Sequence, residues 1–412
     1  MSESETPVRD LSALAVPQVG KLVKTGDVWE PYRLVDASGA VVEPVAEYFR
    51  DLLGCGRSES TLYAYGNGLL RWWRFLAAVE VGWDRATRVE ARDFVRWLQH
   101  ADKPQVGRMR KQSGEAVNAV TGKPKPGRKY QASTRAHTET VLRKFYDFHQ
   151  ESCTGPVINP FPLVRDRRTR RANAHHNPMA PFRNERQGRY RPKIPKRIPR
   201  MIPDSEFNDI FAALGSNRDR ALVAFWVSTG ARASELLGAR FCDADPGQQL
   251  ISVVRKGTRA VQPLPASPDA FVWLRLYQAQ LRGQLPKGRS QPLWWTLRRP
   301  LRPLTYHAAH RMFERVNANL GSNWTLHDLR HTAAYRMSRD PKIPLVDVQW
   351  VMGHASLTTT QLYMTPTGDE VIENVLAHHA RQETNAAARQ APPPAPGYSA
   401  ASLNVLFGRV AP

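Results

Sequence analysis

Five residues in the C-terminal half have types and spacings suited to chemistry on a phosphodiester. His327 and Arg330 lie three positions apart, so on a helix both side chains leave the same face. His354 follows a glycine further along, and Tyr363 lies nine residues beyond it. Arg232 lies upstream, just before a Ser-Glu pair typical of the first turn of a helix. The set combines two guanidinium groups, two imidazoles and a phenol.

Each of these residue types has a role in phosphoryl transfer. Arginine presents a planar fork of donors that matches phosphate oxygens, and two arginines on one phosphodiester stabilise the charge of a pentacoordinate transition state. A tyrosine hydroxyl can attack phosphorus and form a covalent phosphotyrosine, while a histidine and a lysine move the protons. The pattern therefore predicts cleavage through a tyrosine, with no metal and no other cofactor required.

The same residues have other interpretations when they are taken one at a time. His327 and His331 are four positions apart and imitate half of a zinc site, but Asp328 stands where metalloproteases carry Glu. Arg330 would also place a positive charge beside the ion. Arg232 alone could be an ion-paired core residue, and a tyrosine at a helix end is commonly packed. The order and spacing of the whole set favour the phosphodiester interpretation.

The sequence resembles the tyrosine recombinase (phage integrase) family over roughly residues 44–380. Residues 229–236 (TGARASEL) are similar to the family's first arginine box, and residues 327–332 (HDLRHT) are similar to its HxLRH box. Residues 352–363 (MGHASLTTTQLY) are similar to its LGH…Y box, with the tyrosine at the usual distance. Three boxes in this order make the resemblance specific.

The resemblance implies a role for each matching residue. Arg232 and Arg330 would bind the scissile phosphate. His327 and His354 would hydrogen-bond that phosphate and assist proton transfer. Tyr363 would be the nucleophile.

The family also places a lysine in a hairpin turn, where it protonates the departing 5′ oxygen. Lys256 fits that place, with Arg255 and Arg259 as neighbouring cations that could be aligned there instead. By the same resemblance, His331 is expected to pack the phosphate-binding helix rather than to act as a catalyst.

The resemblance further implies a fold and partners. We expect an all-α N-terminal core-binding (SAM-like) domain, followed by a mixed α+β, mainly helical catalytic domain with a small β-sheet. The expected enzyme cuts and rejoins double-stranded DNA without ATP or Mg²⁺, as a homotetramer on synapsed sites, with accessory DNA-bending proteins as further partners. The expected setting is a phage or mobile element, in the cytoplasm at the nucleoid. The alternatives are a type IB-like topoisomerase and a non-catalytic DNA-binding accessory protein.

Hydrophobic spacing predicts the elements that would position these residues. In the N-terminal half, residues 44–100 are expected to be helical, with helical spacing from Val45 to Leu53 and from Leu62 to Leu76 and a helix at about 88–98, and a fourth helix is expected after residues 133–134. The C-terminal half is expected to form helices at 202–214, 219–227, 268–281, 305–320, 325–337, 345–352 and 357–363, with a hairpin of strands at 249–254 and 260–264.

These patterns divide the chain into five parts, and the last is expected to lack regular structure. The parts are an N-terminal extension at 1–43, a helical DNA-binding domain at 44–160 with a basic loop at 101–130, a basic linker at 161–200, a catalytic domain at 201–382 and an Ala/Pro-rich tail at 383–412.

Composition points to a polyanionic partner. The 412 residues include 59 Lys and Arg against 37 Asp and Glu, so the formal net charge is +22. No apolar run is long enough for a membrane span, and the polar N-terminus is unlike a secretory signal. Three scattered cysteines exclude a disulfide scaffold and indicate a reducing compartment. Nucleic acid is the simplest partner for this excess of positive charge.

The charge is concentrated in two segments. Residues 165–200 hold 13 basic and two acidic side chains, and residues 101–130 hold eight basic and two acidic ones. Their Pro and Gly content predicts a linker at 165–200 and a loop at 101–130, and the positive charge of the linker favours a path along the DNA backbone over a merely solvated segment. The candidate DNA-contacting residues are Arg167, Arg168, Arg170, Arg171, Arg108, Arg110 and Lys111.

The basic linker generates a first prediction. Replacing the four candidate arginines between positions 167 and 171 by Gln should flatten the slope of log affinity against log salt by about two to four, because each phosphate neutralised contributes roughly −0.9. Sequence preference should change little, since phosphate contacts position a protein and base contacts specify the site. Binding to cognate and scrambled duplexes between low and physiological salt measures both. An unchanged slope with lost specificity would mean that the linker contacts bases.

Overall fold

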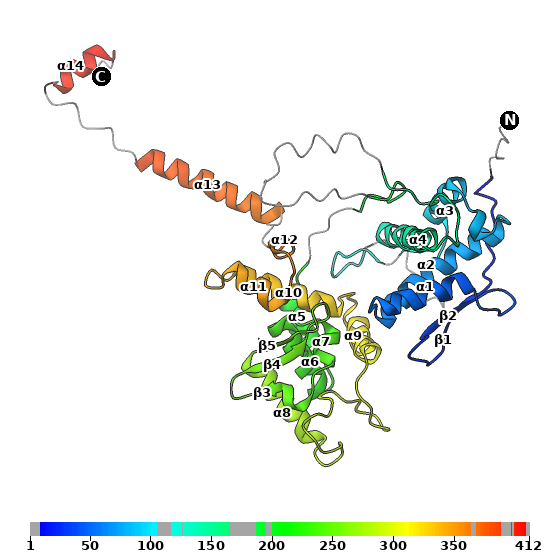
Figure 1. Ribbon diagram of the computed structural model, residues 1–412. Helices are drawn as coiled ribbons and strands as arrows, with labels where there is room; N and C mark the ends of the chain where they lie inside the picture. The colour runs from blue at the N-terminus through cyan, green and yellow to red at the C-terminus, as the bar shows by residue number, and fades with distance from the viewer. Residues whose placement is uncertain are drawn as a thin grey trace. The chain divides into compact units, whose positions relative to one another are not determined.

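The structure is a computed structural model of the chain. It describes residues 9–104, 117–125, 127–164, 187–194, 200–363, 368–388, 397 and 399–408. The chain divides into two compact units, Met1–Lys196 and Arg197–Pro412 (Figure 1). None of the helices in the described ranges is long and apolar enough to cross a membrane.

Among its described residues, the first unit contains four α-helices and one β-hairpin. The helices are α1 (Glu43–Gly54), α2 (Glu59–Ala78), α3 (Arg88–His100) and α4 (Ala132–Glu151), and the antiparallel strands are β1 (Lys21–Lys24) and β2 (Tyr32–Val35). Aromatic rings fill the core between the helices. Trp72 is fully buried and donates its indole N–H to the hydroxyl of Tyr146 at 2.9 Å, and this hydroxyl donates to the carbonyl of Trp83 at 3.0 Å. The polar atoms of these large side chains are therefore satisfied inside the core.

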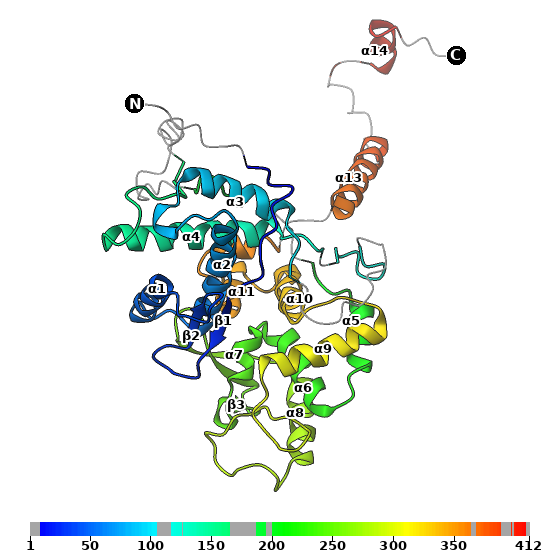
Figure 2. The same cartoon turned by 90° about the vertical axis from the view of Figure 1, so that its right-hand side faces the viewer.

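The described part of the N-terminal extension predicted at residues 1–43 contributes side chains to this core. The hairpin β1–β2 lies beside α1 and α2 in both views (Figures 1 and 2). Leu34 and Val42 are buried in the same cluster as Phe49 of α1. Sequence analysis assigned no strands here, because strands of four residues carry little periodic signal. The hairpin lies outside the domain predicted at 44–160, whose described helices α1 to α4 confirm the expected helical class.

The described residues of the predicted linker on both sides of positions 165–186 also belong to the first unit. Phe161 is fully buried in its core. Leu163 pairs with Gly188 in an antiparallel bridge, and the amide of Val164 donates to the carbonyl of Gln187 at 2.9 Å. The chain thus returns to the same unit after residue 186, and an extended linker over the whole of 161–200 does not describe it.

The second unit is mainly helical and has one small sheet. Its helices are α5 (Asp204–Ala212), α6 (Asn217–Thr229), α7 (Ala233–Leu237), α8 (Pro268–Gln280), α9 (Tyr306–Leu320), α10 (Leu326–Arg339), α11 (Leu345–Met352) and α12 (Leu357–Gln361). The antiparallel sheet has the order β3 (Ala244–Asp245), β4 (Leu250–Val254), β5 (Val261–Pro265), with Ser252 opposite Pro263. These elements confirm the mixed, mainly helical class and agree closely with the predicted boundaries.

Helix α6 forms the centre of the second unit. It is apolar around its circumference from Ala221 to Trp226, which is typical of a buried helix. It packs against α8 on one side and α10 on another, and α10, α11 and α12 lie next to one another (Figure 1). This arrangement brings the end of α6 close to the two helices that carry the histidines and Arg330.

Beyond residue 382 the prediction of a tail without regular structure is wrong for part of the segment. Helix α13 (Gly368–Ala388) continues past that point, and α14 spans Ala400–Leu406. Alanine has the highest helix propensity, and the side chain of Ser399 caps α14 by accepting a hydrogen bond from the amide of Ser402 at 3.2 Å. The prolines at 392–394 separate the two helices in the sequence.

Candidate active site

The start of α10 decides which residues face the site. Thr325 caps the helix: its hydroxyl accepts from the amide of Asp328 at 3.3 Å, and the Asp328 carboxylate accepts from the amide of Thr325 at 2.7 Å. This reciprocal capping box fixes the first turn. His327 is exposed on that turn, whereas Arg330 is only 3% exposed. The helix therefore presents an imidazole at its surface and a guanidinium in the interior.

Arg330 connects three elements through two short hydrogen bonds. One terminal nitrogen donates to the carbonyl of Gly230, at the end of α6, at 2.5 Å, and the other donates to the carbonyl of Met352, at the end of α11, at 2.5 Å. Burial and the positive charge of Arg232 lower the pKa of Arg330 to about 10. Arg330 therefore remains a cation at neutral pH.

Gly230 has to be glycine at this junction. It ends α6 in the left-handed conformation, with φ of 63°. A Cβ atom at this position would lie 2.7 Å from the sulfur of Met352. The left-handed backbone conformation and the close approach of α11 thus both require glycine at position 230.

Glu235 on α7 binds the other cations of the site. Its carboxylate accepts from the amide and a guanidinium nitrogen of Arg232 at 3.0 and 2.8 Å. It also accepts from the guanidinium of Arg255 and the amide of Lys256, each at 3.0 Å. Burial alone would raise the pKa of Glu235, but these hydrogen bonds and the charge of Arg232 outweigh burial and lower it. The ionised carboxylate therefore fixes one arginine and the start of the β4–β5 turn.

The C-terminus of α11 receives donors from three side chains. The last carbonyls of a helix have no partner within it and form the negative end of its dipole. Here Gln262 donates to the carbonyl of Trp350 at 2.9 Å, Arg255 donates to the carbonyl of Val351, and Arg330 donates to the carbonyl of Met352. The sheet and α10 are thereby attached to the end of α11.

This attachment places His354. Gly353 follows α11 in the left-handed conformation, with φ of 59°, and its amide bonds back to Trp350 at 3.0 Å. Nδ1 of His354 lies 2.9 Å from the hydroxyl of Thr360 on α12. Burial, followed by the positive charges of Arg330 and Arg232, lowers the pKa of His354 to about 4. The ring is therefore neutral at pH 7.

Tyr363 lies directly after α12 with its ring between two imidazoles. It is 5% exposed. Its ring is parallel to that of His354, with centroids 6.1 Å apart, and its hydroxyl lies 2.8 Å from Nδ1 of His331. Burial raises the pKa of Tyr363, and the charges of Arg330 and Arg232 oppose that shift. A protonated phenol is thus held in the field of two arginines.

The structure brings most of the predicted site residues together. Arg232, Arg330, His354 and Tyr363 interact with one another, and His327 makes a ring contact with His331 at 4.3 Å between centroids. Partial desolvation and the charge of Arg330 lower the pKa of His327.

The two neighbouring cations in the turn differ in their surroundings. Lys256 is exposed, and its ammonium group has no bonding partner among the described residues. Arg255 is buried and engaged with Glu235, with Gln262 and with the carbonyl of Val351. Of the two, Lys256 has its charge available for another group.

The sequence motifs do not reveal the contributions of three residues. Gln262 was not considered, Arg255 was considered only as a neighbour of Lys256, and His331 was assigned to packing. All three act through contacts across 7 to 96 positions of sequence, which spacing within one element does not reveal. The candidate DNA contacts Arg167, Arg168, Arg170, Arg171, Arg108, Arg110 and Lys111 lie outside the described residues.

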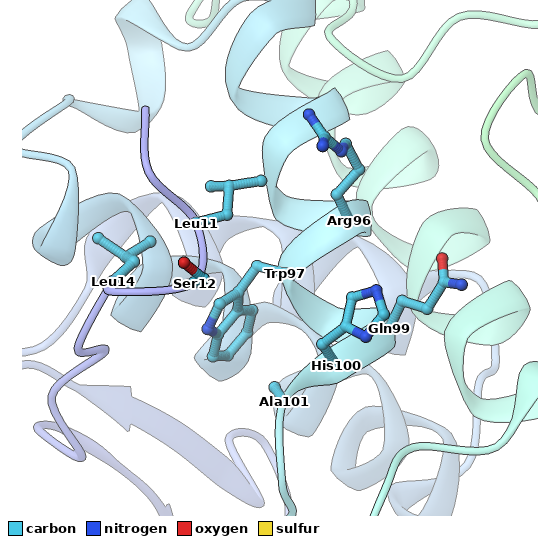
Figure 3. Close-up of a pocket in the computed structure, with 8 residues that line it drawn as sticks. All are labelled: Leu11, Ser12, Leu14, Arg96, Trp97, Gln99, His100 and Ala101. Atoms are coloured by element: carbon cyan, nitrogen blue, oxygen red, sulfur yellow. The ribbon is translucent and has the colours of Figure 1, made fainter. Parts of the chain in front are cut away.

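A separate pocket lies in the first unit. Its volume is about 640 Å³, and the N-terminal segment at Leu11–Leu14 covers it together with Trp97 and His100 of α3 (Figure 3). Arg9 fastens that segment to α3 through ion pairs with Glu90 and Asp93. None of the predicted catalytic residues lines this pocket.

Comparison with known proteins gives matches over both units. The model of the phage integrase family matches residues 200–370, and the model of the phage integrase N-terminal SAM-like domain matches residues 45–114. The tyrosine recombinase XerD of Neisseria meningitidis serogroup B is 28% identical over 197 residues, which cover 46% of this chain and 66% of that protein. The XerD of Corynebacterium glutamicum is 32% identical over 166 residues, covering 40% of this chain and 53% of that protein. The chain thus spans two thirds or less of the length of these relatives.

A solved structure shares the fold. The Tn1549 transposon integrase, in complex with circular intermediate DNA, superposes with a TM-score of 0.52 over 81% of this chain and 98% of that one, at 16% identity.

The buried carboxylate yields a second prediction. Glu235→Gln should lower the free energy of unfolding at pH 7 by about 3–5 kcal/mol, because it leaves Arg255 as a buried cation without its counterion. The pKa of Glu235 is lower in the folded chain than in the unfolded chain. Its stabilisation is therefore present above the unfolded value and is lost as the pH falls through the folded one.

Urea unfolding at pH 7 and at lower pH measures this effect. The matched control is Glu314→Gln, which removes an exposed carboxylate on α9 and should change the stability by at most about 1 kcal/mol. Equal effects of the two substitutions would contradict the role given to Glu235.

Proposed function

Since the chain belongs to the phage integrase family, we propose that it is a site-specific DNA recombinase that cuts and rejoins double-stranded DNA through a 3′-phosphotyrosine at Tyr363. The observation that carries the proposal is that the charges of Arg232 and Arg330 act on Tyr363 and that the ring of His354 lies parallel to the tyrosine ring, although these residues come from four separate parts of the second unit. The relatives named as recombinases and the DNA-bound transposon integrase support DNA as the substrate.

The two arginines would hold the scissile phosphate. A guanidinium has five N–H donors. Arg330 uses two of its terminal nitrogens for the carbonyls at the ends of α6 and α11, and Arg232 uses one for Glu235. In the proposed reaction, the remaining N–H groups of the two arginines would bind phosphate oxygens. Because the existing bonds already orient both forks, little reorganisation is needed as charge develops on phosphorus.

The remaining groups would make and break the bonds. The Tyr363 oxygen attacks phosphorus, the bond from phosphorus to O5′ breaks, and the ammonium of Lys256 gives a proton to O5′. His354 is neutral and can donate a hydrogen bond to a phosphate oxygen, as can His327 at the exposed start of α10. Rejoining is the same sequence in reverse. No hydrolysis of ATP and no metal ion enters this scheme.

The proposal also covers the assembly and the biological setting of the enzyme. We propose that the enzyme acts as a homotetramer on two synapsed sites, in the cytoplasm, for a phage or mobile element. The net charge of +22 and the similarity to a transposon integrase support this setting. Footprinting on DNA that flanks the gene would locate the site, and an assay with paired sites would separate recombination from relaxation by a topoisomerase.

Tyr363→Phe tests the nucleophile. The variant should bind DNA with nearly normal affinity, because the ring and its packing remain, but it should form no covalent adduct with a nicked suicide substrate. Denaturing gels of the trapped complex measure the adduct, and peptide mapping locates it. An adduct that survives the substitution would move the nucleophile to another residue such as Tyr335 or Tyr306.

Charge neutralisation by arginine generates a fourth prediction. Cleavage should persist in excess EDTA, and Arg232→Lys should lower the cleavage rate by about 10²–10³, because a lysine offers a point charge in place of a fork. The matched control is Arg275→Lys on the exposed side of α8, which should cleave like the unaltered protein. Loss of cleavage in EDTA with recovery on adding Mg²⁺ or Zn²⁺ would overturn the assignment.

A further inference from the structure

The hydroxyl of Tyr363 has a specific partner that the scheme above does not use. Nδ1 of His331 lies 2.8 Å from this oxygen, and the two rings are 5.6 Å apart between centroids. His331 is half-buried on α10, one residue after Arg330. The contact joins the helix that carries the phosphate-binding arginine to the end of α12, 32 positions later in the chain.

The attacking phenol needs a proton acceptor. Burial raises the pKa of Tyr363 despite the two nearby arginines, so the hydroxyl carries its proton at neutral pH. A phenol is a weak nucleophile until that proton is removed, and a neighbouring base is the usual means of removal. Such a base must lie within hydrogen-bond distance of the proton.

The neighbouring histidines are arranged differently. His354 lies parallel to the tyrosine ring, and its Nδ1 is engaged with the hydroxyl of Thr360 at 2.9 Å. His327 contacts the ring of His331 rather than the phenol, with an interplanar angle of 72°. Of these three imidazoles, His331 is the one whose nitrogen is within hydrogen-bond distance of the nucleophile's oxygen.

We propose that His331 is a further catalytic residue, the base that accepts the proton of the Tyr363 hydroxyl during cleavage and returns it during rejoining. This inference rests on the proposed function, in which Tyr363 is the nucleophile. It replaces the packing role that the sequence suggested for His331.

The step balances without any other reactant. The proton of the Tyr363 hydroxyl moves to Nδ1 of His331, which therefore must carry its own proton on Nε2 beforehand. The bond from the tyrosine oxygen to phosphorus forms and the bond from phosphorus to O5′ breaks, with O5′ taking a proton from Lys256. In rejoining, O5′ returns its proton to Lys256, and the departing phenolate takes the proton back from His331.

His331→Asn separates proton transfer from positioning. The amide of asparagine can hold the hydroxyl by a hydrogen bond but cannot accept its proton. The rate of adduct formation on a suicide substrate should fall by about 10²–10⁴, the usual contribution of a general base, while DNA affinity stays close to normal. His310→Asn on α9, a half-buried histidine paired with Glu314, is the matched control and should react like the unaltered protein.

Two chemical rescues identify the step that has been lost. Difluorotyrosine at position 363 has a more acidic phenol, so it should restore much of the lost rate in the His331→Asn protein. A substrate with sulfur in place of O5′ needs no protonation of its leaving group, so it should rescue Lys256→Ala but leave His331→Asn slow. A purely structural role for His331 predicts neither pattern.

The outcomes are distinct from those that test the nucleophile. If the unaltered protein forms the adduct at Tyr363 while His331→Asn reacts at full rate, or loses rate that difluorotyrosine does not restore, the assignment of His331 is overturned and the recombinase proposal stands. If the unaltered protein forms no adduct at Tyr363, the recombinase proposal itself fails. His331→Gln provides a second amide variant, judged by the same criteria, if the asparagine variant does not fold.

Discussion

The stability of the second unit depends on how it holds several positive charges close together despite their mutual repulsion and their removal from water. Three guanidinium groups, those of Arg232, Arg255 and Arg330, act on one another across the site, and Glu235 is the carboxylate bonded to two of them. Removing charges from water is costly unless each gains partners. Glu235 supplies four acceptor contacts at 2.8–3.0 Å, and helix-end carbonyls supply the rest. The site retains an excess of positive charge that a phosphate would neutralise.

The helix ends explain why the catalytic groups come from short segments that are far apart in the chain. A carbonyl at the C-terminus of a helix is a fixed partial negative charge. Arg330 bonds to the ends of both α6 and α11, so one side chain determines the spacing of two helices and is itself held by them. Arg255, at the start of the β4–β5 turn, bonds to the carbonyl of Val351 and so attaches this turn to the end of α11. The positions of Lys256 and His354 then follow from backbone connections of one or two residues.

Much of this could be predicted from the sequence, and the exceptions share a physical cause. Helices predicted at 325–337 and 345–352 are confirmed as α10 and α11, because each has a clear start and a hydrophobic face. The hairpin β1–β2 and helix α14 were not predicted, since elements of four to seven residues have little periodicity of their own and depend on packing or a cap. In the same way, the motifs gave the order of the site residues. The bonds from Glu235 and from His331 to Tyr363 join residues that only the tertiary fold brings together.

Burial and the nearby arginines also set the protonation states of His354 and Tyr363, and these states determine what each side chain can contribute. Burial and the charges of the arginines lower the pKa of His354 to about 4, whereas burial raises the pKa of Tyr363 against the opposing charges of the same arginines. At neutral pH the imidazole of His354 is therefore uncharged, so in the proposed reaction it would contribute a hydrogen bond, and arginine and Lys256 would supply the positive charge at the phosphate. A bound phosphate would bring negative charge next to His354 and raise its pKa again. In the proposed reaction, the neutral ring of His354 would bind the phosphate first and would gain affinity for a proton once the phosphate is in place, as a group that assists proton transfer must.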